Sequence, residues 1–229
     1  MAAADVLGCL LVQETAASRS KAVLYPERDE CIAFLQSACD QLVDRSSHGA
    51  LVCDVAIDFV DQCTRSSHAV RHRAWRDVAR ACLFVAIKMN YHYVPEAREV
   101  MDVLGDPFGG STREFFAVEG AVIEALAWRL NPPAVALFVS LLGRDDPRAT
   151  TAALRVWRTV RARSMPHYRP SVQAVALLVH AGAMRATPLC AQIGSTAGNV
   201  TACARILGLT DAVLTATRPK RPRDDRPAG

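Results

Sequence analysis

Helical periodicity runs through almost the whole chain and leaves little room for a sheet. Apolar residues recur at i, i+3 and i+4 over 30–43 and again over 51–63, a spacing typical of amphipathic helices. Residues 81–87 are apolar on nearly every side, which predicts a helix buried among others. Hydrophobic residues make up 51% of the 229 residues, so a sizeable core is available. We therefore predict an all-α fold.

Two sets of about five helices are predicted on either side of residues 131–133 (Asn-Pro-Pro), since proline cannot continue a helix. The predicted helices are 5–15, then 30–43, 51–63, 74–89, 96–104 and 112–128, then 133–142, 147–163, 171–184, a short one from 187, and 200–207 with a final turn at 211–216. The predicted parts are an N-terminal helix and linker (1–24), a first bundle (25–132), a second bundle (133–216) and a disordered basic tail (217–229).

Several helix ends carry residues that commonly start or stop a helix. Ser111, with a glutamate three positions later, predicts a capping box for the helix 112–128. Asp146 followed by Pro147 predicts another helix start. Asn199 is predicted to cap the helix 200–207, and Gly208 to end it.

A carboxylate lies on an apolar helix face, at Glu119. Wound at 3.6 residues per turn, the helix 112–128 places Glu119 in the middle of a stripe formed by Phe115, Phe116, Val122, Ile123 and Leu126. A lone buried charge costs several kcal/mol unless it is paired or neutralised. The best candidate for the cation is Lys88, the only lysine between Lys21 and the tail, which ends the apolar run 81–89. The pair is either internal to the chain or part of a surface that contacts a partner.

The eight cysteines contain no C-x-x-C pair, and most occupy apolar positions of helical patterns. They are therefore predicted to be reduced core thiols. His68 and His72 stand at i, i+4 spacing near Cys63, which can hold zinc. Because no fourth ligand is evident and the region is polar, we predict a solvated helix start instead. No metal site and no cofactor are expected.

Composition and motifs argue against several classes of function. The net charge of +4 is mild, and the arginines at 155, 158, 161 and 163 are predicted to form a solvated face, so no nucleic-acid partner is expected. No apolar run is long enough to cross a bilayer, and the N-terminus lacks the basic region of a secretory signal. No nucleophile triad, phosphate-binding loop or carboxylate pair is present in a suitable pattern. We predict that the chain is not an enzyme.

Several segments resemble the cyclin box. ACLFVAIKM (81–89) resembles its third helix, and LAWRL (126–130) with the Pro-Pro pair resembles its fifth helix and exit. Arg28 with CIAFLQSAC (31–39) resembles the first helix, and AIDFVDQCT (56–64) the second. LVQETAAS (11–18) resembles the N-terminal helix region of D-type cyclins, and the layout is most similar to gammaherpesvirus cyclins. The resemblance is good over 5–132, whereas over 133–214 only helix count and lengths agree. It implies two tandem five-helix cyclin folds after an N-terminal helix.

The resemblance implies a function for Lys88 and Glu119. They fall on the lysine and glutamate with which cyclins contact their kinase. The chain is then expected to be a regulatory subunit that binds and activates a cyclin-dependent Ser/Thr kinase and drives G1/S progression. Kinase substrates or inhibitors are possible further partners.

Arg28 and Asp61 fall on the arginine and aspartate that form a buried bridge in cyclins. The helical wheel alone favours a different reading of Asp61. It places this residue with Asp54 and Asp58, opposite Val52, Ala56 and Phe59, as expected for a solvated acid. Burial of the bridge is therefore implied only by the resemblance.

The apolar patch on which cyclins dock substrate and inhibitor peptides is altered here. Its positions are occupied by Glu27, Glu30, Cys31, Phe34 and Trp75. Because two glutamates replace apolar residues, we expect Arg-x-Leu docking to be weakened or altered. Asp77 also stands where the family usually has a leucine.

Two alternatives remain open from the sequence. One is a transcription factor built of tandem cyclin folds, although an N-terminal zinc ribbon is absent and the second bundle is only partly basic. The other is a scaffold that binds the kinase without activating it. The tail segment RPKRPR (218–223) is either a nuclear import signal or a solubilising end. The expected location is the nucleus and cytoplasm of a host cell.

Overall fold

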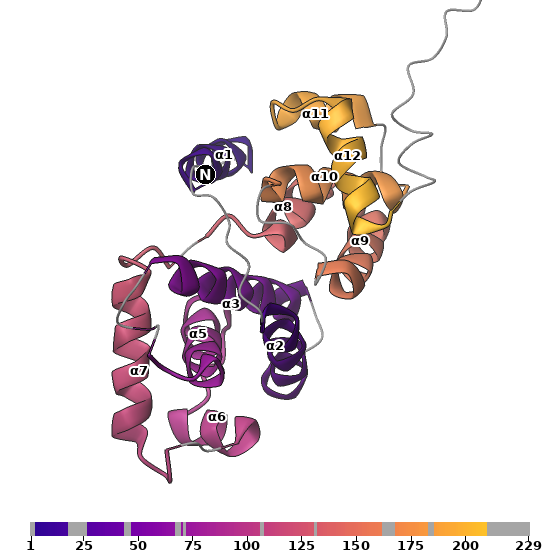
Figure 1. The fold of residues 1–229 in the computed structure, drawn as a ribbon. Helices are drawn as coiled ribbons and strands as arrows, with labels where there is room; N and C mark the ends of the chain where they lie inside the picture. Colours follow the sequence, from indigo (N-terminus) through magenta and orange to yellow (C-terminus); the bar gives the residue numbers. More distant parts are fainter. Residues whose placement is uncertain are drawn as a thin grey trace, which may run out of the picture.

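The computed structural model of the chain describes residues 3–17, 27–43, 47–66, 70, 72–105, 108–130, 132–161, 168–182 and 186–209. Over these residues the structure contains eleven α-helices and no strand, so the predicted all-α fold is confirmed. Helix α1 stands first, and two groups of five helices follow it (Figure 1). The helices are α1 (Ala3–Ala17), α2 (Arg28–Leu42), α3 (Ser47–Ser66), α5 (Trp75–Asn90), α6 (Ala97–Leu104), α7 (Thr112–Ala125), α8 (Val135–Leu142), α9 (Pro147–Val160), α10 (Pro170–His180), α11 (Ala186–Gln192) and α12 (Ala197–Leu207).

The first bundle is built around α5. Every residue of α5 from Val78 to Ile87 is buried, as the apolar run predicts. Helices α2, α3, α6 and α7 all contact α5, and Figure 1 shows α5 between α7 and α2. Large side chains from these surrounding helices, among them Leu35, Phe59 and Phe115, are fully buried against it. Two helices that matter below, α5 and α7, are thereby held side by side.

The second bundle is built around α10, whose residues Ser171–Val179 are all buried. Helix α1 belongs to this bundle although it precedes the first bundle in the chain. Leu10 lies in the second core, and α1 contacts α8. Figure 1 shows α1 on the side of α8 and α10.

A buried carboxylate ties α1 to α10. Glu14 is 1% exposed, and its two oxygens accept hydrogen bonds of 2.7 Å each from the backbone N–H and the hydroxyl of Ser171. Ser171 lies in the first turn of α10, where backbone N–H groups have no partner within the helix. Burial raises the pKa of Glu14, although the bonds from Ser171 and the nearby Arg169 oppose the increase. Glu14 therefore acts as a helix cap supplied from a distant part of the sequence.

The predicted helix ends hold only in part, since α3 begins at Ser47 rather than 51, α9 ends at Val160 rather than 163 and α10 ends at His180 rather than 184. Asp146 accepts from a backbone N–H group of α9, as predicted, and Gly208 ends α12 with φ 76°. Ser111 accepts from the N–H of Glu114, but the predicted capping box is incomplete, because the N–H of Ser111 donates to the carbonyl oxygen of Phe108 and not to the Glu114 side chain. The cap of α12 is Thr196, whose hydroxyl accepts from the N–H of Asn199, so the prediction of Asn199 as the cap is wrong. Helix α7 ends at 125 rather than 128, because residues 127 and 128 adopt positive φ.

The cysteines are core thiols, as predicted. All eight are free, and seven are buried, whereas Cys9 is exposed. Burial raises the pKa of Cys203 to about 12. A thiol with such a pKa is almost fully protonated at neutral pH and is a poor nucleophile.

Candidate functional site

Lys88 and Glu119 form an ion pair between α5 and α7. The Nζ of Lys88 donates to Oε1 of Glu119 at 2.6 Å. Glu119 is buried, with 9% of its side chain exposed, whereas the side chain of Lys88 is 38% exposed. The cation that the buried carboxylate requires is thus supplied within the chain. Because the lysine end of the pair reaches the surface, the pair remains accessible to a second polypeptide.

Aromatic rings surround the ammonium group of Lys88. Its Nζ lies 4.4 Å from the ring centroid of Phe84 and 5.9 Å from that of Phe116, within the range of cation–π attraction. Phe115 bridges these two rings, with centroids 5.3 Å from Phe84 and 6.1 Å from Phe116. The sequence placed Phe116 on the apolar stripe, but Phe116 is 48% exposed. The apolar stripe of α7 therefore continues onto the molecular surface beside the ion pair.

Exposed large apolar side chains are more frequent on α5, α7 and the residues directly after them than elsewhere in the described part of the chain. Isolated exposed apolar residues are ordinary, so the number of them on and directly after these two helices is what favours an interaction surface. Five of the eight large apolar side chains that are exposed in the described part of the chain lie here: Met89, Tyr93, Val94, Phe116 and Trp128. We call these five residues, together with Lys88 and Glu119, the α5–α7 face.

Trp128 is the most exposed of the members of this face that sequence reasoning missed, which also include Tyr93 and Val94. It is 74% exposed, the highest value among the exposed large apolar residues. Its φ of 61° lies in the left-handed region, which costs an L-residue about 1–2 kcal/mol. Residues held in such conformations concentrate at functional sites. The only signal in the sequence was the position of this tryptophan within LAWRL.

Arg28 and Asp61 form a buried ion pair between α2 and α3. The Nε of Arg28 donates to Oδ1 of Asp61 at 3.1 Å, and its Nη2 donates to Oδ2 at 3.0 Å. The side chains are 7% and 10% exposed. The wheel interpretation of a solvated acidic face is wrong, because Asp61 and Asp54 are both buried. Helix α3 is covered on both sides at Asp54 and Asp61, whereas Asp58 is partly exposed.

We expect Arg28→Lys to lower the free energy of unfolding by about 1–2 kcal/mol, because a single ammonium group cannot match both carboxylate oxygens as the planar guanidinium does. Urea denaturation of the two proteins measures the difference. Equal unfolding midpoints would show that the two hydrogen bonds from the guanidinium group to Asp61 do not add to the free energy of unfolding.

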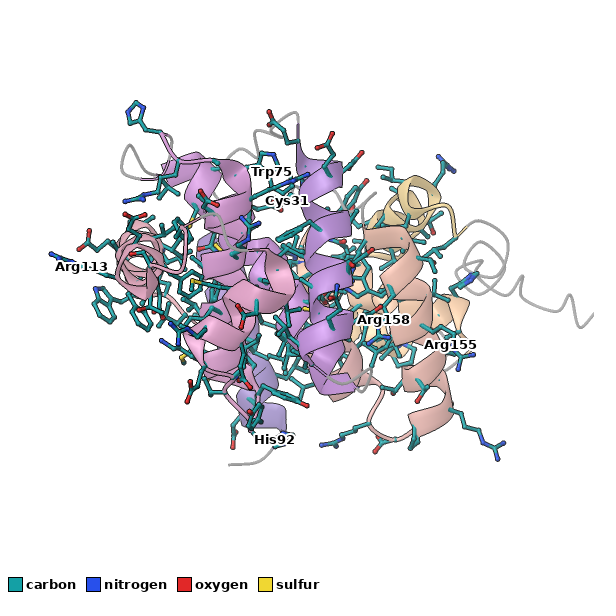
Figure 2. The ribbon with its side chains drawn as sticks, turned by 90° about the horizontal axis from the view of Figure 1, so that it is seen from below. Cys31, Trp75, His92, Arg113, Arg155 and Arg158 are labelled. Atoms are coloured by element: carbon teal, nitrogen blue, oxygen red, sulfur yellow. The ribbon has the colours of Figure 1, made fainter. Side chains whose placement is uncertain are left out.

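The altered docking patch is half buried and acidic at its edge. Phe34 and Trp75 are partly exposed and meet edge to face, with ring centroids 6.0 Å apart. Glu27 and Glu30 are exposed, whereas Cys31 is 1% exposed and lies within the core. Figure 2 labels Trp75 and Cys31 at adjoining places on α5 and α2. The patch therefore offers two aromatic edges and two carboxylates, and Cys31 adds almost no surface.

Asp77, which had no explanation from the sequence, has a structural role. Its carboxylate pairs with Nη1 of Arg80 at 2.9 Å. Arg80 in turn donates from Nε and Nη2 to the carbonyl oxygen of Leu104, at 3.1 and 2.9 Å. Carbonyl groups in the last turn of a helix have no partner within the helix. Asp77 thus orients an arginine that satisfies the C-terminal end of α6.

A buried network that the sequence did not predict joins the two bundles. Asp54 of α3 is 4% exposed and accepts from Nε1 of Trp157 at 2.7 and 2.6 Å and from the backbone N–H of Ala136 at 3.0 Å. Nη1 of Arg161 lies 3.6 Å from Oδ1 of the same carboxylate. Arg161 is 5% exposed, so its assignment to a solvated face is wrong. A second contact, from Nε2 of Gln36 to the carbonyl oxygen of Arg158 at 3.2 Å, also crosses between the bundles.

The remaining predictions concern a metal site, a membrane span and residues outside the described ranges. His72 is exposed, and the described residues contain no group of three or more His, Cys, Asp or Glu side chains that could hold a metal ion. No helix in the described ranges is sufficiently long and apolar to span a membrane. His68, Arg163, the turn predicted at 211–216 and the tail 217–229 lie outside the described residues.

Comparisons with known proteins concern the chain and its fold as a whole. The family model "Cyclin, N-terminal domain" matches residues 11–131. A similar solved structure is that of a viral cyclin from herpesvirus saimiri, with a TM-score of 0.71. It is 15% identical in sequence, and the match covers 92% of this chain and 97% of the viral chain. A search among curated proteins found no match. At this identity, the viral cyclin demonstrates a shared fold over nearly the whole chain.

Proposed function

This chain belongs to the cyclin family, and we propose that it is the regulatory subunit that binds and activates a cyclin-dependent Ser/Thr kinase. Cyclins are regulatory, non-catalytic subunits, so the activity is expected from the kinase and not from this chain. The observation that carries the proposal is the α5–α7 face. It combines a partly exposed Lys88–Glu119 pair with exposed apolar side chains on the two helices that supply the pair.

The proposed mechanism is a population shift in the kinase. A protein kinase is active when a mobile helix turns inward, so that its glutamate pairs with the active-site lysine. A rigid surface that binds this inward state more tightly than the outward state increases its population. The α5–α7 face is suited to this role, because both helices are fixed by the buried core of the first bundle. A stable regulatory interface of this kind buries about 2,000 Å² or more.

Co-purification with a panel of cell-cycle kinases tests the proposal. The purified chain is expected to retain a G1-type kinase and to raise its phosphorylation of histone and retinoblastoma-type substrates. Failure to retain any kinase of the panel would contradict the proposal. Retention without an increase in phosphorylation would instead identify a scaffold that binds the kinase without activating it.

The acidic edge of the docking patch leads to a prediction about substrate peptides. We expect a labelled Arg-x-Leu peptide to bind at least about tenfold more weakly to the wild-type chain than to the Glu27→Val/Glu30→Leu variant. In the wild-type chain, the leucine of the bound peptide would cover two carboxylates and remove them from water, which costs free energy. Fluorescence anisotropy measures both affinities. Tight docking to the wild-type surface beside Glu30 and Trp75 would contradict the prediction.

We also propose that the chain works in the nucleus and cytoplasm of a host cell infected by a virus. The basic segment 218–223 supports import, and the similarity of fold to a viral cyclin supports the origin. A fluorescent fusion is expected to lose nuclear signal when residues 217–229 are deleted. An unchanged distribution would contradict the role of the tail.

A further inference from the structure

The two halves of the chain carry opposite charge, which the mild net charge conceals. Residues 1–132 contain 18 Asp and Glu against 13 Lys and Arg. Residues 133–229 contain only five Asp and Glu against 14 Lys and Arg. Within 133–209 the only acids are Asp145 and Asp146, and Asp146 is used to cap α9. The described part of the second bundle is therefore basic, with few carboxylates to neutralise it.

Helix α9 presents this charge to solvent. Its sequence, PRATTAALRVWRTV, contains no acidic residue. Arg148, Thr151 and Arg155 are exposed at i, i+3 and i+7, so they lie along one side of the helix. Neither Arg148 nor Arg155 forms a hydrogen bond or ion pair with another residue that the structure describes. Both guanidinium groups are thus available to a ligand.

An open hollow of about 410 Å³ lies between these two arginines. It is lined by Pro147, Arg148, Thr151, Ala152 and Arg155, which we call the α9 face. The hydroxyl of Thr151 donates to the carbonyl oxygen of Pro147 at 2.8 Å, so its proton is already used within the helix. The only charged groups among the lining residues are the two guanidinium groups.

The α9 face lies away from the α5–α7 face. Figure 1 shows α7 and α9 on opposite sides of the molecule. Figure 2, turned by 90°, shows Arg155 and Arg158 at one side and Arg113 of α7 at the other. A ligand on the α9 face would leave the α5–α7 face uncovered. Binding at the α9 face consequently does not depend on the proposed kinase function.

We propose that the α9 face binds an acidic, extended peptide segment of a partner protein. A guanidinium group is planar and matches a carboxylate with two parallel hydrogen bonds. Seven residues of α-helix separate the two arginine Cα atoms by about 10 Å along the axis. In an extended polyproline II peptide, residues i and i+3 point to the same side about 9 Å apart. Acidic residues at every third position therefore fit Arg148 and Arg155.

Nucleic acid fits this face less well. Binding of single strands relies on exposed aromatic side chains on which bases stack. Among the described residues of 133–209, Ile206 is the only exposed large hydrophobic residue, no large aromatic side chain is exposed there, and Trp157 is buried. Two arginines also provide few of the phosphate contacts on which affinity for a duplex depends. The chemistry of the hollow favours carboxylates on a peptide.

Fluorescence anisotropy with a labelled peptide tests the proposal. The probe is a twelve-residue peptide of Pro and Ala with glutamate at every third position, and its control carries glutamine at those positions. We expect the acidic probe to bind the full chain, and Arg148→Glu/Arg155→Glu to weaken binding at least tenfold. The charge-matched control Arg98→Glu/Arg113→Glu, on exposed positions of α6 and α7, is expected to change binding less than twofold. Thermal melts of both variants establish that each is folded.

Three outcomes would overturn the proposal. They are no binding of the acidic probe by the wild-type chain, equal weakening by both double variants, and tighter binding of a labelled oligonucleotide through the same two arginines. Failure here is distinguishable from failure of the kinase proposal. Arg148→Glu/Arg155→Glu is expected to retain the kinase, whereas Glu119→Ala is expected to lose the kinase and retain the peptide.

Discussion

Glu119→Ala is expected to weaken binding of the cyclin-dependent kinase by about 2–4 kcal/mol, roughly 30- to 1,000-fold in Kd. The carboxylate is buried and holds the Nζ of Lys88 at 2.6 Å, so its removal leaves the ammonium group without its partner. Groups of the kinase that meet the pair in a desolvated interface would also lose a partner. Isothermal titration of purified kinase with the wild-type and variant chains measures the loss.

Controls separate this effect from unfolding. Glu124→Ala removes an exposed carboxylate from the same helix and is expected to leave kinase affinity unchanged. Trp128→Ala removes an exposed ring, so it should retain the melting temperature and still weaken binding by about 1–3 kcal/mol. Wild-type affinity in a folded Glu119→Ala variant would remove the basis for assigning the kinase to the α5–α7 face.

Asp54→Ala is expected to lower the free energy of unfolding by about 3–5 kcal/mol, because it breaks a buried ion pair by removing one partner. The substitution leaves the guanidinium group of Arg161 buried without its ion-pair partner and the indole N–H of Trp157 buried without its acceptor. It also removes the acceptor for the backbone N–H of Ala136 at the start of α8. Urea denaturation measures the change, and a loss under about 1 kcal/mol would contradict the role of Asp54 as the link between bundles.

Asp54→Asn is the informative comparison, because the amide oxygen can still accept hydrogen bonds. Burial raises the pKa of Asp54 above its ordinary 3.8, although Arg161, Trp157 and Ala136 oppose the increase. Between 3.8 and the raised value, the folded protein binds a proton that the unfolded chain does not, so this group destabilises the fold as pH rises through that window. Asp54→Asn should therefore cost less than Asp54→Ala. The stability of the wild type relative to Asp54→Asn should increase as the pH falls through the same window.

In the candidate site, the ion pair could be predicted from the sequence, whereas the exposed aromatic residues could not. The cost of a buried charge singled out Glu119 and required a cation, and Lys88 was the available one in the sequence. The structure joins them. The exposure of Phe116 and the left-handed backbone of Trp128 were not predictable in the same way. Both depend on how α7 lies against α5 and on where the chain leaves the helix.

Local patterns in the sequence determined the eleven helices, the buried helix at the centre of the first bundle and the helix ends at Ser111, Asp146 and Gly208, because hydrophobic periodicity and capping residues act within a few positions of one another. Glu119 apart, only the tertiary structure decided which polar residues are buried. Asp54 and Arg161 were interpreted as polar residues facing water, and nothing in the sequence indicated the burial of Glu14, yet all three are buried where one packed unit meets another. A helical wheel shows which residues share one side of a helix, but it does not show whether another helix packs on the opposite side. Here the second bundle packs on α3, and α1 packs on the second bundle. These contacts bury the charged groups and also provide their hydrogen-bond and ion-pair partners.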